Sequence, residues 1–263
     1  MRLFWEITRR SFRRFMTYRA AALAGLVTNV FFGLLRVSVL LALYDGRPEV
    51  AGYTVPGIIT YTALTQAVIA YLSLFGWFDL MQSVYTGEIA ADLLKPMRLF
   101  TFWLAQDTGR AAVNILLRGV TIMIIYGLLF DLTYPQTAVQ TLAVILTIIL
   151  SWLLSFTWRF LINLPAFWTP NARGIVRLGY VLAWFFSGFL MPLRFLPDWV
   201  QRVAYLTPFP HMLNSVVDVY VGVLSGTELL RVLLIQAAWV LALALMGQLV
   251  LKTAVRRLVI LGG

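Results

Sequence analysis

Residues 137–161 read TAVQTLAVILTIILSWLLSFTWRFL, an apolar stretch without an acidic residue. A helix needs roughly 20 apolar residues to cross the hydrocarbon core of a bilayer, so this stretch predicts a membrane span. The rest of the chain has the same character, because 61% of its 263 residues are hydrophobic and only 12% are charged. Soluble domains contain about 25% charged residues. The composition therefore excludes a water-soluble globule.

Five further apolar stretches predict membrane spans. With the first they give six, over about residues 20–44, 54–78, 105–130, 137–161, 175–190 and 229–251. The stretch from residue 20 exceeds the apolar part of a signal peptide, about 7 to 15 residues, so we expect it to be retained. Gly188 and Pro192 interrupt the fifth span. The predicted fold is an all-α integral membrane domain over residues 20–251.

Residues 1–19 precede the first span and are rich in arginine. At 100° per residue, the apolar side chains fall on one broad arc and Glu6 and most of the arginines on the opposite one, which is typical of a helix lying in the headgroup plane. A solvated basic tail is the alternative. The apolar arc consists of Leu3, Phe4, Ile7, Phe12, Phe15 and Met16.

The basic residues predict the orientation of the chain. Residues 1–19, the connections 79–110 and 159–177, and the tail 252–263 hold most of the 21 Lys and Arg residues. The opposite side has Arg47, Arg194, Arg202 and Arg231. Because basic loops stay on the cytoplasmic side, both termini are predicted to be cytoplasmic. Lipid headgroups explain the net charge of +10 without a nucleic-acid partner.

The sequence offers little material for an active site. It has no cysteine and one histidine, His211, which argues against a thiol nucleophile and a His or Cys zinc site. Neither Lys95 nor Lys252 follows the glycine-rich loop that cradles nucleotide phosphates. Asp107 falls in the lead-in to the third predicted span and the other acidic residues fall outside the spans, so none is expected deep in a span. We predict that the chain is not an enzyme and binds no metal or cofactor of its own.

Two arginines fall inside predicted spans, Arg36 in the first and Arg118 in the third. A charge at the bilayer centre costs at least about 2.5 kcal/mol on insertion scales, so both should face protein or a wet cavity. One interpretation is a structural bond between helices, to Asn114, Asn29 or a backbone carbonyl. The other makes these arginines part of a translocation path.

The inner connection, residues 79–100, is longer than a turn. Thr86 is predicted to cap a short helix over about residues 85–96, with Glu88 in its first turn and Pro96 at its end. This helix could dock into another protein or pack back on the membrane surface. The outer connection, before the last span, is divided by prolines, and its short apolar segments predict a hairpin over about residues 191–224 that enters the outer leaflet.

In their order along the chain, these features resemble the permeases of ABC-2 type exporters. Among these permeases, the chain is most similar to the short bacterial ones. The resemblance is carried by the amphipathic start, by the segment Gly87–Glu88–Ile89 to Leu93–Leu94–Lys95–Pro96, and by the outer sequence around Ser187–Gly188, Pro192, Leu196–Pro197, Trp199 and Pro208. The residues that would then contact an ATPase are Tyr85, Thr86, Gly87, Glu88, Ile89, Asp92, Leu93, Lys95 and Pro96. Gly188, Pro192, Pro197, Trp199 and Pro208 would form an outer gate.

The resemblance implies a dimer of permeases in the bacterial inner membrane with two cytoplasmic ATPase subunits, which would hold ATP and Mg²⁺. Its substrate would be a drug-like, lipid or other amphipathic molecule that is exported. Two alternatives remain at this point. A self-sufficient secondary transporter or channel would need no ATPase, and a membrane assembly scaffold would transport nothing.

Overall fold

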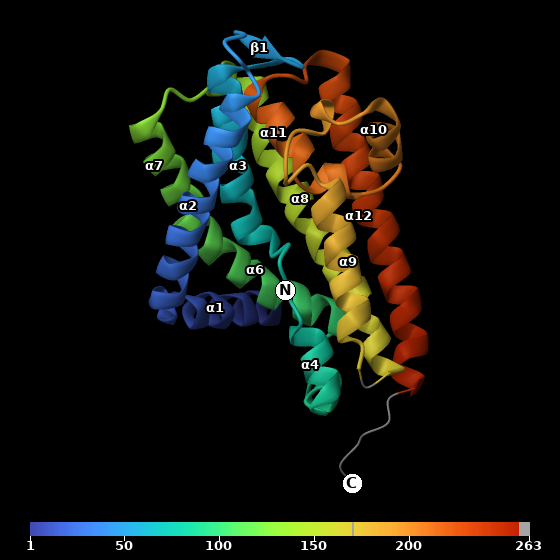
Figure 1. Ribbon diagram of the computed structural model, residues 1–263. Helices are drawn as coiled ribbons and strands as arrows, with labels where there is room; N and C mark the ends of the chain where they lie inside the picture. Colours follow the sequence, from blue (N-terminus) through green and yellow to red (C-terminus); the bar gives the residue numbers. More distant parts are fainter. Residues whose placement is uncertain (170, 258–263) are drawn as a thin grey trace.

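Five long apolar helices form the body of the protein (Figure 1). The computed structural model describes residues 1–169 and 171–257. The helices are α2 (Arg19–Ala42), α3 (Val55–Leu72), α6 (Leu99–Asn114) continuing through the π-helical turn η1 (Ile115–Gly119) into α7 (Val120–Leu129), α8 (Ala138–Asn163) with the 3₁₀ turn η2 (Leu164–Phe167), and α12 (Gly226–Ala254) with η5 (Val255–Arg257). The helical membrane fold predicted from the sequence is thereby confirmed in its class.

The fifth predicted span, residues 175–190, is shorter in the structure than a bilayer requires. It is α9 (Arg173–Phe186), whose 14 residues extend over about 21 Å at 1.5 Å per residue, less than the ~30 Å hydrocarbon core. After α9 the chain forms the short helices η3 (Leu193–Phe195), α10 (Asp198–Tyr205), η4 (Phe209–Met212) and α11 (Asn214–Val221). Since α11 packs on α8 and α3, and η4 on α8, α9 and α12, these helices fill the bundle above α9 (Figure 1).

Helix α3 is the centre of the bundle. Of its 18 residues, 89% are buried, whereas 11% are buried in the most apolar 18-residue stretch of α12 and η5. The reason is its position, since α3 contacts α2, η1, α7, α8 and α11. Thr54 caps its start by accepting a hydrogen bond from the Gly57 amide at 3.2 Å, Pro56 lies in its first turn, and Ser73 ends it in the left-handed region with φ of +54°. The helices around α3 have exposed apolar faces, which would contact lipid in a membrane.

Helix α1 (Arg2–Thr17) lies across one end of the bundle, nearly at right angles to α2 (Figure 1). The hydroxyls of Thr8 and Ser11 donate hydrogen bonds to the carbonyls of Ala105 and Gln106 on α6, at 3.1 and 2.6 Å. The backbones meet at Gly109, where a Cβ atom would lie 2.4 Å from the Thr8 carbonyl oxygen. The predicted amphipathic helix is present, and it is fixed to protein by its small polar side chains.

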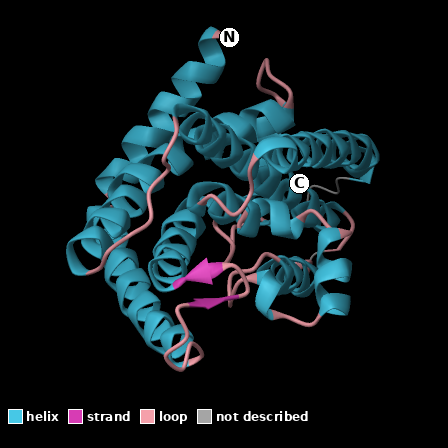
Figure 2. Cartoon of the chain, turned by 90° about the horizontal axis from the view of Figure 1, so that it is seen from above, coloured by secondary structure: helices cyan, strands magenta, loops and turns pink. Residues whose placement is uncertain are grey.

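The two ends of the bundle differ in structure. The short strands β1 (Glu49–Val50) and β2 (Tyr53–Thr54) pair antiparallel, with Glu49 opposite Thr54, at the end away from α1 (Figures 1 and 2). The last turns of α12 lie at the same end as α1 (Figure 1). Of the predicted tail 252–263, residues 252–254 still belong to α12, and residues 258–263 lie outside the described residues.

Candidate coupling region and buried charge cluster

The predicted coupling segment forms two short helices at the end of the bundle where α1 lies. Helix α4 (Asp79–Tyr85) is followed by α5 (Ile89–Leu93). The prediction that Thr86 starts the helix is wrong, because Thr86 ends α4 and its hydroxyl donates to the Gln82 carbonyl at 3.1 Å. Gly87 then takes φ of +80°, which side chains disfavour. The sequence between Tyr85 and Ile89 is therefore a turn.

The coupling segment presents one face outward and buries the other. Tyr85, Glu88 and Pro96 are exposed, whereas Ile89 is fully buried. Asp92 is not free for a partner, since it accepts a hydrogen bond from Lys95 Nζ at 2.6 Å. The same ammonium group lies 3.7 Å from the centre of the Phe102 ring. Of the acidic residues in this segment, Glu88 is thus the one left exposed at its tip.

Two cavities flank the coupling segment. One of about 370 Å³ lies toward α1 and includes Ile7, Arg14, Lys95 and Pro96 in its lining. The other, of about 530 Å³, lies toward α12 and is lined partly by Leu93 and Lys252. The segment between them projects from the bundle, and α4 is visible below α6 in Figure 1. A protein that binds to this segment could place side chains in both cavities.

The start of α4 is tied to α8 and α9. The hydroxyl of Tyr180 on α9 accepts from the Trp77 amide and donates to the Trp77 carbonyl, both at 2.8 Å. The side chain of Asn163, the last residue of α8, donates to the same carbonyl at 3.1 Å and accepts from the Met81 amide at 3.2 Å. The coupling segment is therefore hydrogen-bonded directly to two helices of the bundle.

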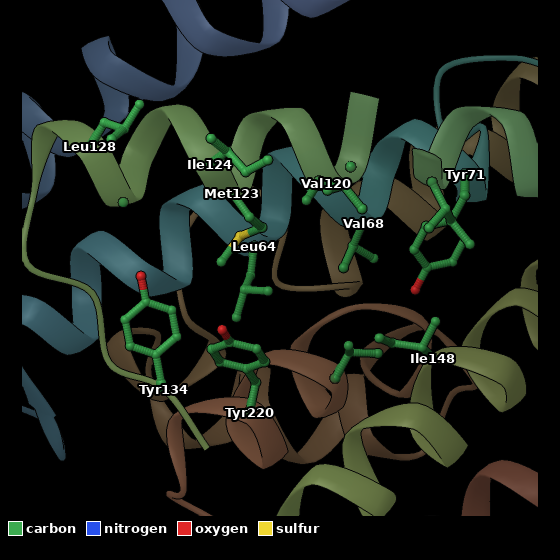
Figure 3. Close-up of a pocket in the computed structure, with 15 residues that line it drawn as sticks. Leu64, Val68, Tyr71, Val120, Met123, Ile124, Leu128, Tyr134, Ile148 and Tyr220 are labelled. Atoms are coloured by element: carbon green, nitrogen blue, oxygen red, sulfur yellow. The ribbon is translucent and has the colours of Figure 1, made fainter. Parts of the chain in front are cut away.

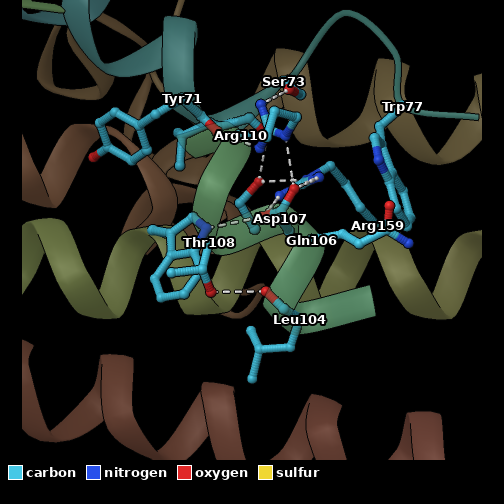
Figure 4. A network of polar contacts seen from close by, with 12 residues as sticks. Tyr71, Ser73, Trp77, Leu104, Gln106, Asp107, Thr108, Arg110 and Arg159 are labelled. Atoms are coloured by element: carbon cyan, nitrogen blue, oxygen red, sulfur yellow. Dashed lines mark hydrogen bonds and ion pairs between the residues drawn. The ribbon is translucent and has the colours of Figure 1, made fainter. Parts of the chain in front are cut away.

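A buried cluster of three charges lies behind this segment (Figure 4). Asp107 on α6 receives two hydrogen bonds from Arg159 on α8, at 3.0 and 2.8 Å, and one from Arg110 at 2.7 Å. The indole of Trp152 donates to the same carboxylate at 2.8 Å. Arg110 also donates to the Tyr71 carbonyl at 2.7 Å and to the Ser73 hydroxyl. The cluster thus joins the end of α3 to α6 and α8.

The sequence predicts Asp107 in the connection that leads into the third span, and the structure corrects this. Asp107 lies on the span-length helix Leu99–Leu129 and is 2% exposed. Arg110 and Arg159 were not recognised as buried, although the i, i+3 spacing of Asp107 and Arg110 is a signal for a pair on one helix face. The pairing with Arg159 had no such signal, because the two residues are 52 positions apart.

The two arginines predicted within spans have different surroundings. Arg118 lies in the π-helical turn η1 and donates to the Gly25 carbonyl on α2 at 3.4 Å, which is one of the structural bonds considered. Its Nε atom is buried and has no hydrogen-bond partner among the described residues. Arg36 donates to the Thr65 hydroxyl at 3.3 Å and lies 4.1 Å from the centre of the Phe189 ring. Their role in a translocation path stays a prediction.

The predicted outer gate is partly assembled around Asn214. Gly188 has φ of +82°, and its carbonyl accepts from the Tyr61 hydroxyl. The Asn214 side chain accepts from Tyr61 at 3.1 Å and donates to Asp218 at 2.8 Å. Asp218, within the predicted hairpin, is buried on α11 and accepts from the Tyr53 hydroxyl.

The other predicted gate residues are spread along this segment. Trp199 on α10 is 69% exposed. The prolines mark the starts of short helices: Pro192 before η3, Pro197 before α10, and Pro208 before η4. They shape the backbone of this segment.

Among the described residues, no group of three or more His, Asp or Glu side chains could hold a metal ion.

Comparison with known proteins identifies the family. The family model described as ABC-2 family transporter protein matches residues 30–262, which include part of α2, all the later spans, the coupling segment and the helices from η3 to α11. No curated protein matches the chain. The match covers most of the chain and agrees with the resemblance seen in its motifs. The chain therefore belongs to the ABC-2 family of transporter proteins and is a membrane component of an ABC transporter system.

Proposed function

We propose that the chain is the permease subunit of an ATP-driven exporter in the bacterial inner membrane. Two permeases, identical or related, would bind two cytoplasmic ATPase subunits through their coupling segments. Both termini would be cytoplasmic, and α9 with the helices up to α11 would complete a sixth crossing. The substrate would be a drug-like, lipid or other amphipathic molecule. ATP and Mg²⁺ would be held by the ATPase.

The observation that carries this proposal is the coupling segment itself. It presents exposed Glu88 at its tip between two cavities, while its start is hydrogen-bonded to Asn163 and Tyr180. An ATPase that closes on ATP would push α4 and α5. The hydrogen bonds at Trp77 would pass this displacement to α8 and α9, and α9 leads directly to Gly188 and the outer helices.

Charge reversal at the tip tests the proposal. In vesicles containing the chain and its ATPase, we expect Glu88→Lys to lower ATP-driven transport at least tenfold, because the tip would lose its acidic contact with the ATPase. The matched control is Glu228→Lys, which changes an exposed residue in the first turn of α12, away from the coupling segment. Normal transport by Glu88→Lys, at equal amounts of protein in the membrane, would contradict the assignment.

A self-sufficient secondary transporter or channel is the second candidate. The carboxylate of Asp107 now lies inside a span, where proton-coupled carriers commonly place one. Its pairing with two guanidinium groups argues for a structural role. Uphill transport by the purified chain alone, without nucleotide, would favour this candidate. A scaffold would show no transport with or without an ATPase.

A further inference from the structure

A cavity of about 450 Å³ lies between α3, the η1–α7 segment, α8 and α11 (Figure 3). Neither Arg36 nor Arg118 belongs to its lining, and none of the described residues that line it is charged. Its walls are mainly aliphatic, and they include Leu64, Val68, Val120, Met123, Ile124 and Ile148. Its volume lies within the range of about 300 to 1,000 Å³ that ligand pockets occupy.

The local backbone helps to explain why a cavity forms here. Gly119 and Gly127 line the cavity without contributing a side chain. Gly119 ends the π-helical turn, where one residue more than in an α-turn shifts the register of the following side chains. Such turns occur frequently at functional sites in proteins. The cavity is therefore a product of this irregular helix.

The cavity opens beside the exposed apolar face of α7. Leu128 is 81% exposed and Ile124 is 56% exposed, and both belong to the span-length helix Leu99–Leu129. In a bilayer these side chains face hydrocarbon. An apolar space of this kind holds water poorly, and an empty one loses dispersion contacts along its walls. Its natural occupant is therefore apolar.

The cavity is elongated. It follows α3 from Leu64 to Tyr71 and the η1–α7 segment from Ile115 to Leu128, about 10 and 20 Å at 1.5 Å per residue. An extended hydrocarbon chain fits an elongated apolar space of this kind.

One end of the cavity is polar. Tyr220, on α11, directs its hydroxyl toward Leu64 (Figure 3). The hydroxyl of Tyr134, between α7 and α8, lies against Gly127, where an added Cβ atom would be 3.0 Å from it. Neither hydroxyl donates a hydrogen bond to another described residue. At the opposite end, the Tyr71 hydroxyl is within 3.3 Å of the Ser151 hydroxyl. Two free donors at the outer end and an apolar interior match an amphipathic molecule with its polar group outward.

We propose that this cavity binds one acyl chain of an outer-leaflet phospholipid, whose ester or phosphate oxygens accept hydrogen bonds from Tyr134 and Tyr220. The site does not depend on an ATPase or on the direction of transport. It would hold a lipid in the resting protein, beside the Asn214 group of the outer segment.

Photolabelling in nanodiscs tests the proposal. The discs contain phosphatidylethanolamine and phosphatidylglycerol with a small fraction of phosphatidylcholine that carries a diazirine on one acyl chain. We expect labelled peptides from Val68, Met123 and Ile148. Met123→Trp should fill the cavity and lower this labelling at least fivefold, whereas Leu241→Trp, on the 64% exposed position of α12, should not. Equal labelling in both variants would overturn the proposal.

A second variant preserves the shape of the cavity. Tyr134→Phe with Tyr220→Phe removes only the two hydroxyls, so we expect labelling to fall at least threefold while the thermal unfolding temperature stays unchanged. Unchanged labelling would overturn the headgroup contact and with it the proposed orientation. Because the natural chain has no cysteine, Met123→Cys gives a clean control for a second copy. A Met123→Cys disulfide dimer without lipid labelling would show a subunit interface instead.

Discussion

At the scale of single residues, Asp107 holds three helices together. Its carboxylate receives hydrogen bonds from two buried guanidinium groups and one indole. An isolated charge in a membrane has a high free-energy cost. A buried ion pair is stable there only when nearly all of its hydrogen-bond donors and acceptors have partners. Arg159 meets this requirement because it donates hydrogen bonds to Asp107 and, at 3.2 Å, to the Ser155 hydroxyl. Two guanidinium groups face one carboxylate here, so the cluster keeps a net positive charge.

Replacing Asp107 by Asn should therefore destabilise the protein strongly. Breaking one partner out of a buried ion pair costs about 3 to 5 kcal/mol, and here two guanidinium groups would lose their counter-ion. We expect a clear fall in the thermal unfolding temperature of the detergent-solubilised protein. Asp131→Asn, an exposed site after α7, is the matched control. Equal unfolding temperatures of the two variants would show that the cluster does not stabilise the fold.

Some of these residues could be predicted and others could not. Arg118 and Arg36 stood out because each interrupts an apolar run. Arg159 lies in an equally apolar stretch but near its end, where an arginine can reach the interface. Asn163 and Tyr180 gave no signal, since their partners are backbone groups of Trp77 and Met81. Contacts between distant segments follow from packing that a sequence pattern does not encode.

At the scale of helices, the backbones of α1 and α6 approach each other closely where the two helices cross. Gly109 allows it, because any Cβ there would lie within 2.6 Å of both the Thr8 carbonyl oxygen and the Phe12 nitrogen. Backbone atoms cannot move aside as a flexible side chain can. The amphipathic helix is thus held by shape as well as by the hydroxyls of Thr8 and Ser11.

Gly109→Ala should displace α1 from α6. The arginines of α1 would then become accessible, and we expect trypsin to cleave within residues 1–19 several times faster than in the natural protein. Gly174→Ala, at a helical glycine whose added Cβ would meet no atom within 4 Å, is the control. Cleavage of Gly109→Ala at the rate of Gly174→Ala would mean that the crossing is not needed to hold α1.

Helix positions were predicted better than helix environments. Long apolar runs and the alternating faces of α1 suffice to predict that a helix forms. They do not indicate that α3 is enclosed while α12 faces lipid, because the exterior of a membrane protein is as apolar as its interior. The break between α4 and α5 was missed for a local reason. Thr86 could lie at the end of one helix or at the start of the next. The positive φ of Gly87 places it at the end of α4.

At the scale of the whole molecule, the two ends of the bundle are joined through α8 and α9. Helix α9 binds Trp77 through Tyr180, near its middle, and its C-terminal end continues to Gly188, which contacts Tyr61. Asn214 then connects this turn to α3 and α11. A displacement of α4 therefore has a continuous hydrogen-bonded route to the outer helices, as the proposed ATP-driven mechanism requires.

Asn163→Leu should remove the hydrogen bonds between α4 and α8, which run parallel to those of Tyr180 on α9. The Met81 amide and the Trp77 carbonyl would lose a partner, so α4 could move without drawing α8 along. In vesicles with the ATPase, we expect ATP hydrolysis to remain within twofold of the natural complex and transport per ATP hydrolysed to fall at least fivefold. Asn171→Leu, an exposed site in the connection after α8, is the control. If ATP hydrolysis and transport fall together, Asn163 supports folding or assembly and does not transmit the motion.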